Sequence, residues 1–137
     1  MKSGTIGVET SSSMELIDIT TKINRAIGES GHSSGVCFLY NPHTTSALTI
    51  NEGADPAVQE DLLAAFKKMV PADIPYKHQE GNSPAHLLTT MVGSSEMVFF
   101  DKGSLTLGTW QRLFFCEFDG PRKRKIHWRI MPAKPLT

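Results

Sequence analysis

Apolar residues recur at helical spacing most clearly between positions 56 and 69. The apolar stripe there consists of Val58, Leu62, Ala65, Phe66 and Met69. Asp55 is a suitable N-cap residue, Pro56 suits the first helical position, and Pro71 ends the pattern. The sequence therefore predicts an amphipathic helix whose stripe faces the core.

Two further stretches show weaker helical patterns. The first predicted helix runs from about Thr21 to Glu29, with the hydroxyl of Thr20 as its cap and Gly31 at its end. The second begins at Ser83-Pro84 and ends at Gly93. The residues of this second helix that are expected to face the core are Ala85, Leu88, Met91 and Val92.

Alternation with a period of two predicts strands in the rest of the chain. The segments with this pattern are MELIDIT, SGVCFLYNP, TTSALTINE, EMVFFD, SLTL, GTWQRLFFCEFDG and KRKIHWRIM. Asn41-Pro42-His43 forms a corner between the second and third segments, because Pro interrupts a ladder and Asn favours a turn. From Trp110 to Phe118 both faces are largely apolar, so this strand is expected to be buried centrally or covered by another subunit.

These elements predict an α+β protein with mainly antiparallel β-sheets in a sandwich-like arrangement and two or three helices. A chain of 137 residues and 15.1 kDa suits one compact domain over residues 1–137. Within it, residues 1–13 are expected to form a polar N-terminal segment and residues 132–137 a C-terminal tail. Cys37 and Cys116 lie within apolar runs, so we expect small hydrophobic thiols and no disulfide scaffold.

The balance of charges and the lengths of the apolar runs limit which classes of partner the protein can bind. The 14 Lys and Arg residues balance 14 Asp and Glu residues, so any anion-binding site must be local. The amino terminus lacks the apolar region of a secretion signal, and no run approaches the roughly 20 apolar residues that span a bilayer. A soluble, cytoplasmic protein without a membrane partner is expected.

The loop YKHQEGNSPAH gathers ionisable and turn-forming residues directly before a helix start. His78 and His86, with Glu80 between them, could chelate a divalent metal, although their separation is not one of the tight spacings typical of zinc sites. A helix amino terminus also binds anions and favours the neutral form of a nearby histidine. For His86, a ligand-binding role and an ordinary surface position both stay open.

Other polar groups stand at element boundaries. His43 lies at a bend before two threonines, where it could enter a cleft or simply serve the turn. Asn51 and Glu52 end the next predicted strand, where they could act in a site or cap the following helix. Asp61 falls on the shoulder of the apolar stripe, where a carboxylate needs a cation, a histidine or a lysine as partner.

The last third of the chain carries two more candidate segments. Trp110 and Gln111 should point to opposite faces of their strand, so Trp110 packs or stacks on a heteroaromatic ligand while Gln111 can hydrogen-bond. The run GPRKRKIHWR, which begins its basic part at Arg122, is a nucleic-acid patch, a solvated strand edge or a phosphate contact by one arginine. Zero net charge and the lack of an RNA-module motif argue against a nucleic-acid partner.

The segments PHTTSALTINE, DPAVQEDL, HQEGNSPAH, GSLTLGTWQ and EFDGPRKR, in this order, resemble the YjbQ-like family of secondary thiamine-phosphate synthases. The resemblance covers the chain from about Glu15 to Met131. It implies an α+β fold and a homotrimer with polar pockets near subunit boundaries. It also implies a weak transferase activity that joins a hydroxymethylpyrimidine diphosphate to a thiazole phosphate and releases pyrophosphate.

The resemblance further implies a set of site residues. Catalytic roles are expected for His43, His78, His86 and Gln111. Substrate or phosphate binding is expected for Thr44, Thr45, Asn51, Gly81, Asn82, Thr109 and Arg122. The expected ligands of a divalent metal, Mg²⁺ or Zn²⁺, are His78, His86, Glu52, Asp61 and Glu80.

The sequence thus predicts a thiamine-phosphate-synthase-like enzyme with a histidine-rich pocket and small phosphorylated substrates. The alternative is a non-catalytic trimer that binds a divalent metal or a phosphorylated metabolite, with the synthase activity incidental. The predicted mechanism requires that His43, His78 and His86 converge on one cavity near unpaired backbone amides.

Overall fold

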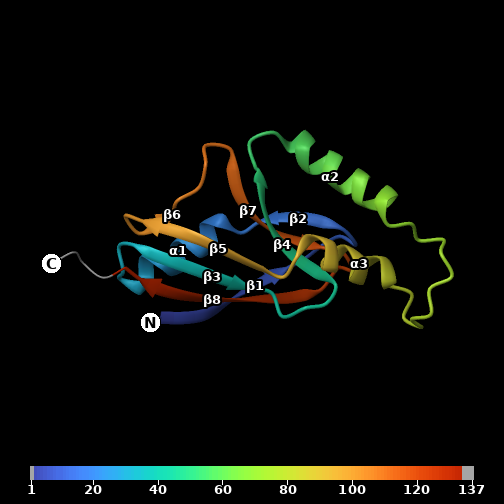
Figure 1. Cartoon of the computed structure of the whole chain (residues 1–137), viewed down its shortest axis with the longest axis horizontal. Coiled ribbons are helices and arrows are strands. Elements are labelled where there is room, and N and C mark those ends of the chain that lie inside the picture. Colours follow the sequence, from blue (N-terminus) through green and yellow to red (C-terminus); the bar gives the residue numbers. More distant parts are fainter. Residues whose placement is uncertain (1, 134–137) are drawn as a thin grey trace.

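Residues 2–133 are described by the computed structural model, which arranges them in two antiparallel sheets and three helices (Figure 1). The strands are β1 (Lys2–Glu9), β2 (Glu15–Asp18), β3 (Gly35–Tyr40), β4 (Ser46–Glu52), β5 (Ser95–Asp101), β6 (Ser104–Leu105), β7 (Gln111–Glu117) and β8 (Lys123–Pro132). The helices are α1 (Thr20–Ser30), α2 (Pro56–Met69) and α3 (Ser83–Val92). The predicted α+β class with mainly antiparallel sheets is confirmed.

One sheet has the order β1-β8-β3-β5-β6 and the other the order β2-β7-β4. Strand β1 lies in the region expected to be a polar segment. It pairs with β8 in an unbroken register from Lys2 opposite Ile130 to Glu9 opposite Lys123. Its sequence, KSGTIGVE, contains too few apolar residues to signal a strand. Pairing with the long strand β8 stabilises it instead.

The main core lies between the two sheets and includes α1. Ile23 and Ile27 of α1 and Leu113 and Phe115 of β7 have no exposed surface. Cys116 and Phe118 point the other way and pack in a second cluster with residues of α3. The prediction that this strand is buried centrally is therefore confirmed from Leu113 to Phe118, whereas Trp110 before it is 62% exposed.

Both thiols are buried, as expected for small hydrophobic side chains. Burial raises the pKa of Cys37 to about 11. Burial, with a further contribution from the charge of Glu96, raises the pKa of Cys116 to about 12. Neither thiol is therefore a reactive thiolate at neutral pH.

Helix α1 ends as predicted but begins differently. Gly31 adopts a left-handed conformation with φ of 80° and ends the helix. The side chain of Thr20 does not cap the helix; its hydroxyl accepts a hydrogen bond from the amide of Leu113 at 2.8 Å. The carboxylate of Asp18 instead accepts the amide of Thr20 at 2.9 Å.

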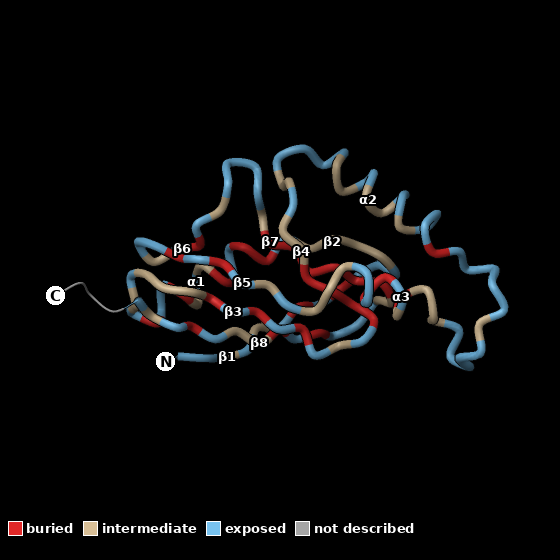
Figure 2. Tube along the Cα trace, viewed as in Figure 1, coloured by how far each residue is buried: buried red, intermediate tan, exposed pale blue. Residues whose placement is uncertain are grey.

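Helix α2 is capped as predicted but is not buried as predicted. The carboxylate of Asp55 accepts the amide of Ala57 at 2.9 Å, and Pro56 follows it at the helix start. No residue of α2 is buried, and Met69 is 57% exposed (Figure 2). The apolar stripe therefore does not face the core of its own chain, although Phe66 contacts Phe118 edge to face with ring centroids 5.8 Å apart.

Helix α3 packs on the three-stranded sheet through fewer apolar residues than expected. Ala85 and Leu88 are buried, whereas Met91 is 56% exposed. Thr89 is buried and donates its hydroxyl to the carbonyl of Ala85 at 2.9 Å, so its polar group is satisfied within the helix. No helix in the described part of the chain is long and apolar enough to cross a membrane.

Candidate functional site

The three histidines singled out in the sequence line one cavity of about 380 Å³. His43 comes from the bend between β3 and β4, His78 from the loop before α3, and His86 from the first turn of α3. The rings of His78 and His86 meet edge to face with centroids 5.2 Å apart. Convergence of the three imidazoles on a shared cavity, the central expectation from the sequence, is confirmed.

Other predicted site residues line the same cavity. They are Thr44, Thr45, Glu80, Asn82 and Arg122. Gly81 joins Glu80 to Asn82 in the loop and has a φ of 76°, a conformation that glycine adopts without strain. The segment that precedes α3 therefore contributes to the site as a unit.

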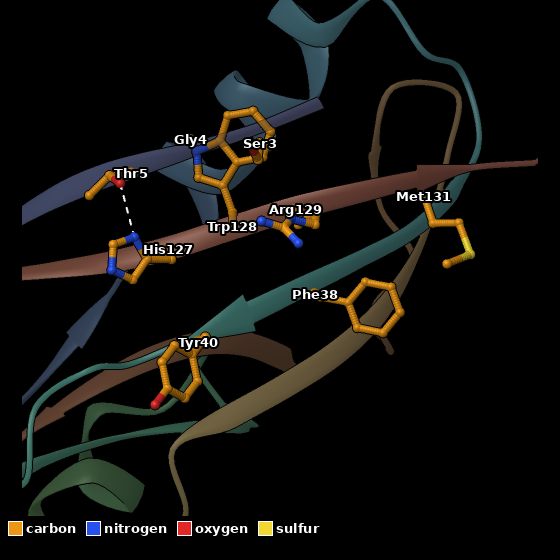
Figure 3. A pocket seen from close by; sticks show the side chains of 9 residues that line it. All are labelled: Ser3, Gly4, Thr5, Phe38, Tyr40, His127, Trp128, Arg129 and Met131. Carbon is orange, nitrogen blue, oxygen red and sulfur yellow. Dashed lines mark hydrogen bonds between the residues drawn. The ribbon is translucent and has the colours of Figure 1, made fainter. Parts of the chain in front are cut away.

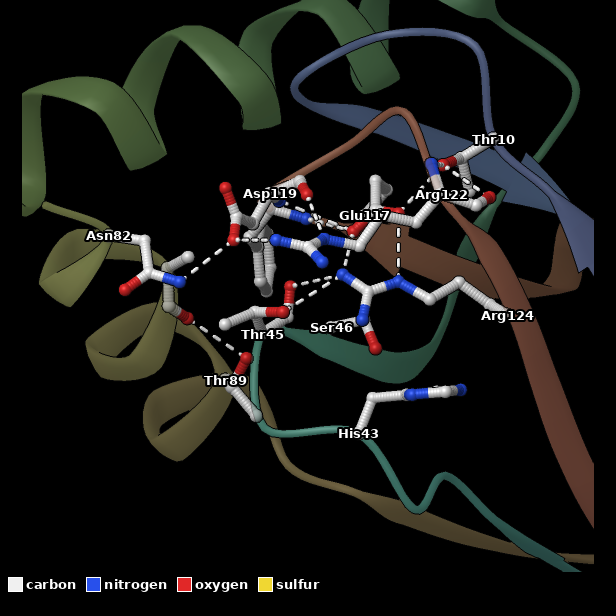
Figure 4. A network of polar contacts seen from close by, with 12 residues as sticks. Thr10, His43, Thr45, Ser46, Asn82, Thr89, Glu117, Asp119, Arg122 and Arg124 are labelled. Carbon is white, nitrogen blue, oxygen red and sulfur yellow. Dashed lines mark hydrogen bonds and ion pairs between the residues drawn. The ribbon is translucent and has the colours of Figure 1, made fainter. Parts of the chain in front are cut away.

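A buried ion pair that the sequence reading did not identify forms one side of the cavity (Figure 4). The guanidinium of Arg124 donates to both carboxylate oxygens of Glu117, and these residues are 7% and 0% exposed. The guanidinium also donates to the hydroxyl of Thr45 at 2.9 Å. Because Thr45 lies beside His43, this pair supports the strand start that carries the histidine.

The network around Glu117 satisfies the carboxylate fully. Thr10 donates its hydroxyl to Glu117 at 2.7 Å, and the amides of Phe118 and Asp119 donate to the second oxygen at 3.1 and 3.2 Å. Burial alone would raise the pKa of Glu117, but the hydrogen bonds from Arg124 and Thr10 outweigh it and hold this pKa below its ordinary value. The pair is therefore ionised at neutral pH.

His43 is held in one orientation by the backbone of β8. The amide of Lys125 donates to Nε2 of His43 at 3.0 Å, which requires a lone pair on that nitrogen and places the proton of the neutral ring on Nδ1. Burial, followed by the positive charge of Arg124, lowers the pKa of His43. A neutral imidazole with an N–H donor is thus the form present at neutral pH.

Asp119 joins the loop to the basic hairpin. One of its carboxylate oxygens accepts from the side-chain amide of Asn82 at 2.8 Å and from the guanidinium of Arg122 at 2.9 Å. The carbonyl oxygen of Asn82, Oδ1, is buried and is the one such side-chain atom in the described residues that lacks a hydrogen-bond partner. A buried acceptor without a donor is energetically unfavourable.

Backbone amides contribute less to the site than the sequence suggested. Pro84 has no N–H, and the amides of Ala85 and His86 donate to the carbonyl of Asn82 at 3.0 and 3.4 Å. The expected row of unpaired amides at the start of α3 is thus partly used within the helix. The cationic donors at the cavity are instead Arg122 and Arg124.

The solvated-edge reading of the basic hairpin is wrong for Arg124, which is buried, whereas Lys123, Lys125 and Arg129 are exposed. The sequence did not predict three residues of this network. Glu117 was expected in an apolar strand, Asp119 in a turn and Arg124 on a solvated strand edge. A charged residue inside the apolar run LFFCEF was the signal that a buried partner exists.

The residues expected to ligate a metal are only partly assembled. His78, His86 and Glu80 line the cavity, but Asp61 is exposed on α2 and lines none of the cavities that contain a histidine. Across residues 2–133 no group of three or more His, Cys, Asp or Glu side chains is arranged to hold a metal ion. This donor set does not fit a complete metal site in one chain, so we derive no chemical step from a metal.

A second set of predicted site residues lies at the other end of β4. Glu52 is opposite Gln111 in the register of β4 and β7, whereas Ser46, next to Thr45, is opposite Glu117. At a rise of about 3.4 Å per residue, Glu52 lies roughly 20 Å from the start of the strand. The members of this second set are Asn51, Glu52, Thr109 and Gln111. A single chain therefore does not bring the second set together with the histidines.

A hollow of about 730 Å³ lies on the outer face of the five-stranded sheet (Figure 3). Phe38 and Tyr40 of β3 line it together with His127 of β8. Tyr40 and His127 stack with ring centroids 6.5 Å apart, and Nδ1 of His127 lies 3.0 Å from the hydroxyl of Thr5. This hollow is mainly apolar and contains none of the predicted catalytic side chains.

Comparison with known proteins places the chain among close relatives. The family profile described as UPF0047 protein YjbQ-like matches residues 4–133. The UPF0047 protein YugU of Bacillus subtilis is 43% identical over 128 residues, which cover 93% of this chain and 97% of that protein. A UPF0047 protein of Methanocaldococcus jannaschii is 42% identical over 127 residues, 93% of this chain and 92% of its own.

Solved structures agree with this similarity. A protein from Clostridium acetobutylicum, described as an uncharacterised conserved protein of the YjbQ/UPF0047 family, is 45% identical with a TM-score of 0.89, and the match covers 93% of this chain and 98% of that one. A hypothetical protein from Aeropyrum pernix is 34% identical with a TM-score of 0.90, covering 97% of this chain and 100% of that one.

Proposed function

The chain belongs to the UPF0047 YjbQ-like family, and from that premise we propose that it is a transferase of the secondary thiamine-phosphate synthase type. In the proposed reaction, a ring nitrogen of a thiazole phosphate attacks the methylene carbon of a hydroxymethylpyrimidine diphosphate. A C–N bond forms, the C–O bond to the diphosphate breaks, and pyrophosphate leaves with the electron pair. The observation that carries the proposal is the convergence of three imidazoles and two arginines on one cavity.

The chemistry of this reaction needs donors where negative charge develops. As the C–O bond breaks, charge grows on the bridging oxygen, and preorganised N–H donors lower that barrier. His43 supplies Nδ1–H because Lys125 occupies its other nitrogen. Arg122 and Arg124 supply charge-assisted N–H donors for the diphosphate, while their carboxylate partners hold them in position and offset part of their charge.

The test is synthesis of thiamine phosphate from the two precursors by the purified protein. Replacing His43, His78 or His86 by alanine is expected to lower kcat by about 10²- to 10⁴-fold, the range for a positioned proton donor or acceptor. His32, which lies just after α1 and does not line the cavity, offers a matched control. Undiminished synthesis by all three cavity variants would contradict the proposal.

A non-catalytic role gives a different result in the same experiment. Tight binding of phosphate or a divalent ion by the wild-type protein, without any turnover of the precursors, would identify a binding protein instead. Loss of that binding in the His86→Ala variant would still place the ligand in the cavity, because His86 lines it.

We also propose that the chain assembles as a homotrimer, and that the second set of polar residues acts at the cavity of a neighbouring copy. Two observations support assembly: α2 has an apolar stripe with no buried residue, and the outer sheet exposes Phe99 and Met97 by 64% and 59%. A head-to-tail ring would bring the Gln111 end of one chain to the histidine end of the next.

Mixing two variants tests this arrangement. His86→Ala and Gln111→Ala chains are each expected to be inactive, whereas mixed trimers contain some sites with both residues intact. Random assembly of equal amounts should restore about a quarter of the wild-type activity, because each site takes one residue from each of two chains. No recovery, with mixed trimers shown by mass spectrometry, would mean that Gln111 does not act at the histidine cavity of a neighbouring chain.

A further inference from the structure

A second cavity adjoins the first and shares its histidines. It has a volume of about 580 Å³ and lies between the bend after β3 and the exposed side of α3. Pro42, His43, Thr44 and His86 line both cavities. His43 and His86 therefore stand on the boundary between two adjacent spaces.

The two cavities differ in the charge of the remaining lining. The first adds three charged side chains, Glu80, Arg122 and Arg124. The second contains no Asp, Glu, Lys or Arg side chain. It adds three hydroxyl-bearing residues, Thr89, Thr90 and Ser94, and the residue Tyr40.

The hydroxyls of the second cavity favour a neutral polar ligand. Thr90 donates its hydroxyl to the carbonyl of His86 at 3.0 Å, and Thr89 donates to Ala85. Each oxygen retains lone pairs that can accept from a ligand N–H or O–H group. With no cation to offset the cost, an anionic group would lose hydration there without compensation.

In the first cavity, Arg124 has a further donor for an anion. Its Nε and one terminal nitrogen are used by Glu117 and Thr45. The other terminal nitrogen, Nη1, has no hydrogen-bond partner within residues 2–133, and it is not among the buried atoms that lack one. This nitrogen is therefore free to donate to a phosphate oxygen at the cavity that Arg124 lines.

From this contrast we infer that the site is divided into two subsites: one whose cationic donors, Arg122 and Arg124, bind a diphosphate, and a neutral, hydroxyl-lined one for an uncharged nitrogen-bearing ring, with His43 and His86 at the junction. The inference rests on the proposed function and adds the substrate orientation. A substrate that spans both subsites places its methylene–oxygen bond beside the two imidazoles. The bond that breaks then lies next to N–H donors, and the ring stays away from the arginines.

Two single-residue variants separate the subsites. Thr90→Trp fills the neutral cavity from the exposed face of α3, and Leu87→Trp on the same helix is the matched control because Leu87 lines neither cavity. Arg122→Ala removes charge from the cationic cavity, and Lys123→Ala is its matched control because Lys123 lines neither of the two. Far-UV circular dichroism checks that each variant is folded.

Binding is measured by calorimetry with inorganic pyrophosphate and, separately, with the free uncharged hydroxymethylpyrimidine. Thr90→Trp should weaken binding of the ring by at least about tenfold and leave pyrophosphate within about twofold. Arg122→Ala should weaken pyrophosphate by about tenfold or more, the effect of a charge-assisted hydrogen bond, and leave the ring unaffected. Both controls should match the wild type, and the two probes should bind the wild type together.

The possible outcomes distinguish this inference from the proposed function. Equal weakening of both probes by either variant, mutual exclusion of the probes, or no binding of the ring to the wild type would overturn the two subsites. If the binding pattern is as expected but no thiamine phosphate forms, the subsites stand and the proposed reaction fails. If synthesis occurs but Thr90→Trp leaves ring affinity unchanged, the reaction stands and the subsites fail.

Discussion

The two ends of strand β4 differ in how their polar residues are held. At the first end, Ser46 lies opposite Glu117, and the Glu117–Arg124 pair is buried beside the histidine cavity. At the other end, Glu52 lies opposite Gln111, and the neighbouring pair of Arg112 and Asp18 is 40% and 35% exposed.

Side chains at the exposed end mainly hydrogen-bond to backbone amides that are close in the sequence. The side-chain oxygen of Asn51 accepts the amide of Glu52 at 2.7 Å, and that of Gln111 accepts the amide of Gly108 at 2.9 Å. At the histidine end, in contrast, the polar contacts join β7 and β8 to the residues just after β1 and just before β4. The comparison indicates that long-range, buried contacts preorganise a site, whereas local contacts at an edge leave side chains available to a neighbour.

The largest expected effect comes from breaking the buried pair. Glu117→Ala leaves Arg124 as an uncompensated buried charge, which should lower the free energy of unfolding by about 3–5 kcal/mol. Urea denaturation of the variant and the wild type measures this loss. A decrease below about 1 kcal/mol would mean that the two ends of β4 are held equally loosely.

Acid should weaken the same pair. Because the folded state holds the pKa of Glu117 below its ordinary value of 4.5, the pair contributes its full stability above that pH. As the pH falls through the folded pKa, the carboxylate takes up a proton and the contribution is lost. A Glu117→Gln variant should show a smaller loss of stability in acid than the wild type when both are melted between pH 3 and 7, a range that spans the ordinary pKa of 4.5.

Binding of a divalent ion at the histidine end would change the free energy of unfolding somewhat less than breaking the buried pair does. Zn²⁺ or Mg²⁺ at a hundred times its dissociation constant should stabilise chelator-treated protein by about 2.7 kcal/mol. His78→Ala should abolish that shift in melting temperature, whereas Asp61→Ala should not, because Asp61 is exposed on α2 outside the cavity. An equal loss in both variants would contradict the placement of the ion beside His78 and His86.

The pH profile of His43 is a further test of the histidine end. The pKa of His43 is lowered, so the unfolded chain takes up this proton first as the pH falls below about 6.5. Stability is therefore fully present above that pH and decreases as the pH falls towards the folded pKa. The acidic limb of kcat/KM should also lie below pH 6.5 and should be absent in the residual activity of His43→Ala; an acidic limb above that pH would contradict the neutral ring.

The smallest effect is expected at the exposed end of β4. Arg112→Gln removes a largely solvated ion pair, whose contribution is typically about 0–1 kcal/mol. The same urea experiment as for Glu117→Ala measures it. A loss as large as that of Glu117→Ala would remove the contrast between the two ends.

Much of the fold followed from the sequence because its signals are local. Asp55 and Pro56 mark the start of α2, Gly31 ends α1, and the alternation in β7 predicts burial on both faces; each depends on residues close together in the chain. The strand β1 was missed because its few apolar residues give no such signal. Its pairing with β8 joins residues more than a hundred positions apart.

The candidate site was partly predictable for a similar reason. His78, Glu80, Asn82 and His86 belong to one short loop and helix start, so their proximity was visible in the sequence. The role of Arg124 was not, because a basic residue in a basic run is usually solvated and only the fold reveals that it faces Glu117. The position of Gln111 relative to the histidines likewise depends on the register of β4 and β7.

The sequence by itself determined most of the elements, the start of α2, the end of α1 and the residue types that can bind a phosphate, since these depend on side-chain chemistry and on contacts a few residues apart. Only the tertiary structure decided that the three histidines share a cavity, that Glu117 and Arg124 neutralise each other beneath it, and that the Gln111 end lies elsewhere. The physical reason is that strand pairing sets distances between residues far apart in the chain. Periodicity along the sequence does not specify those distances.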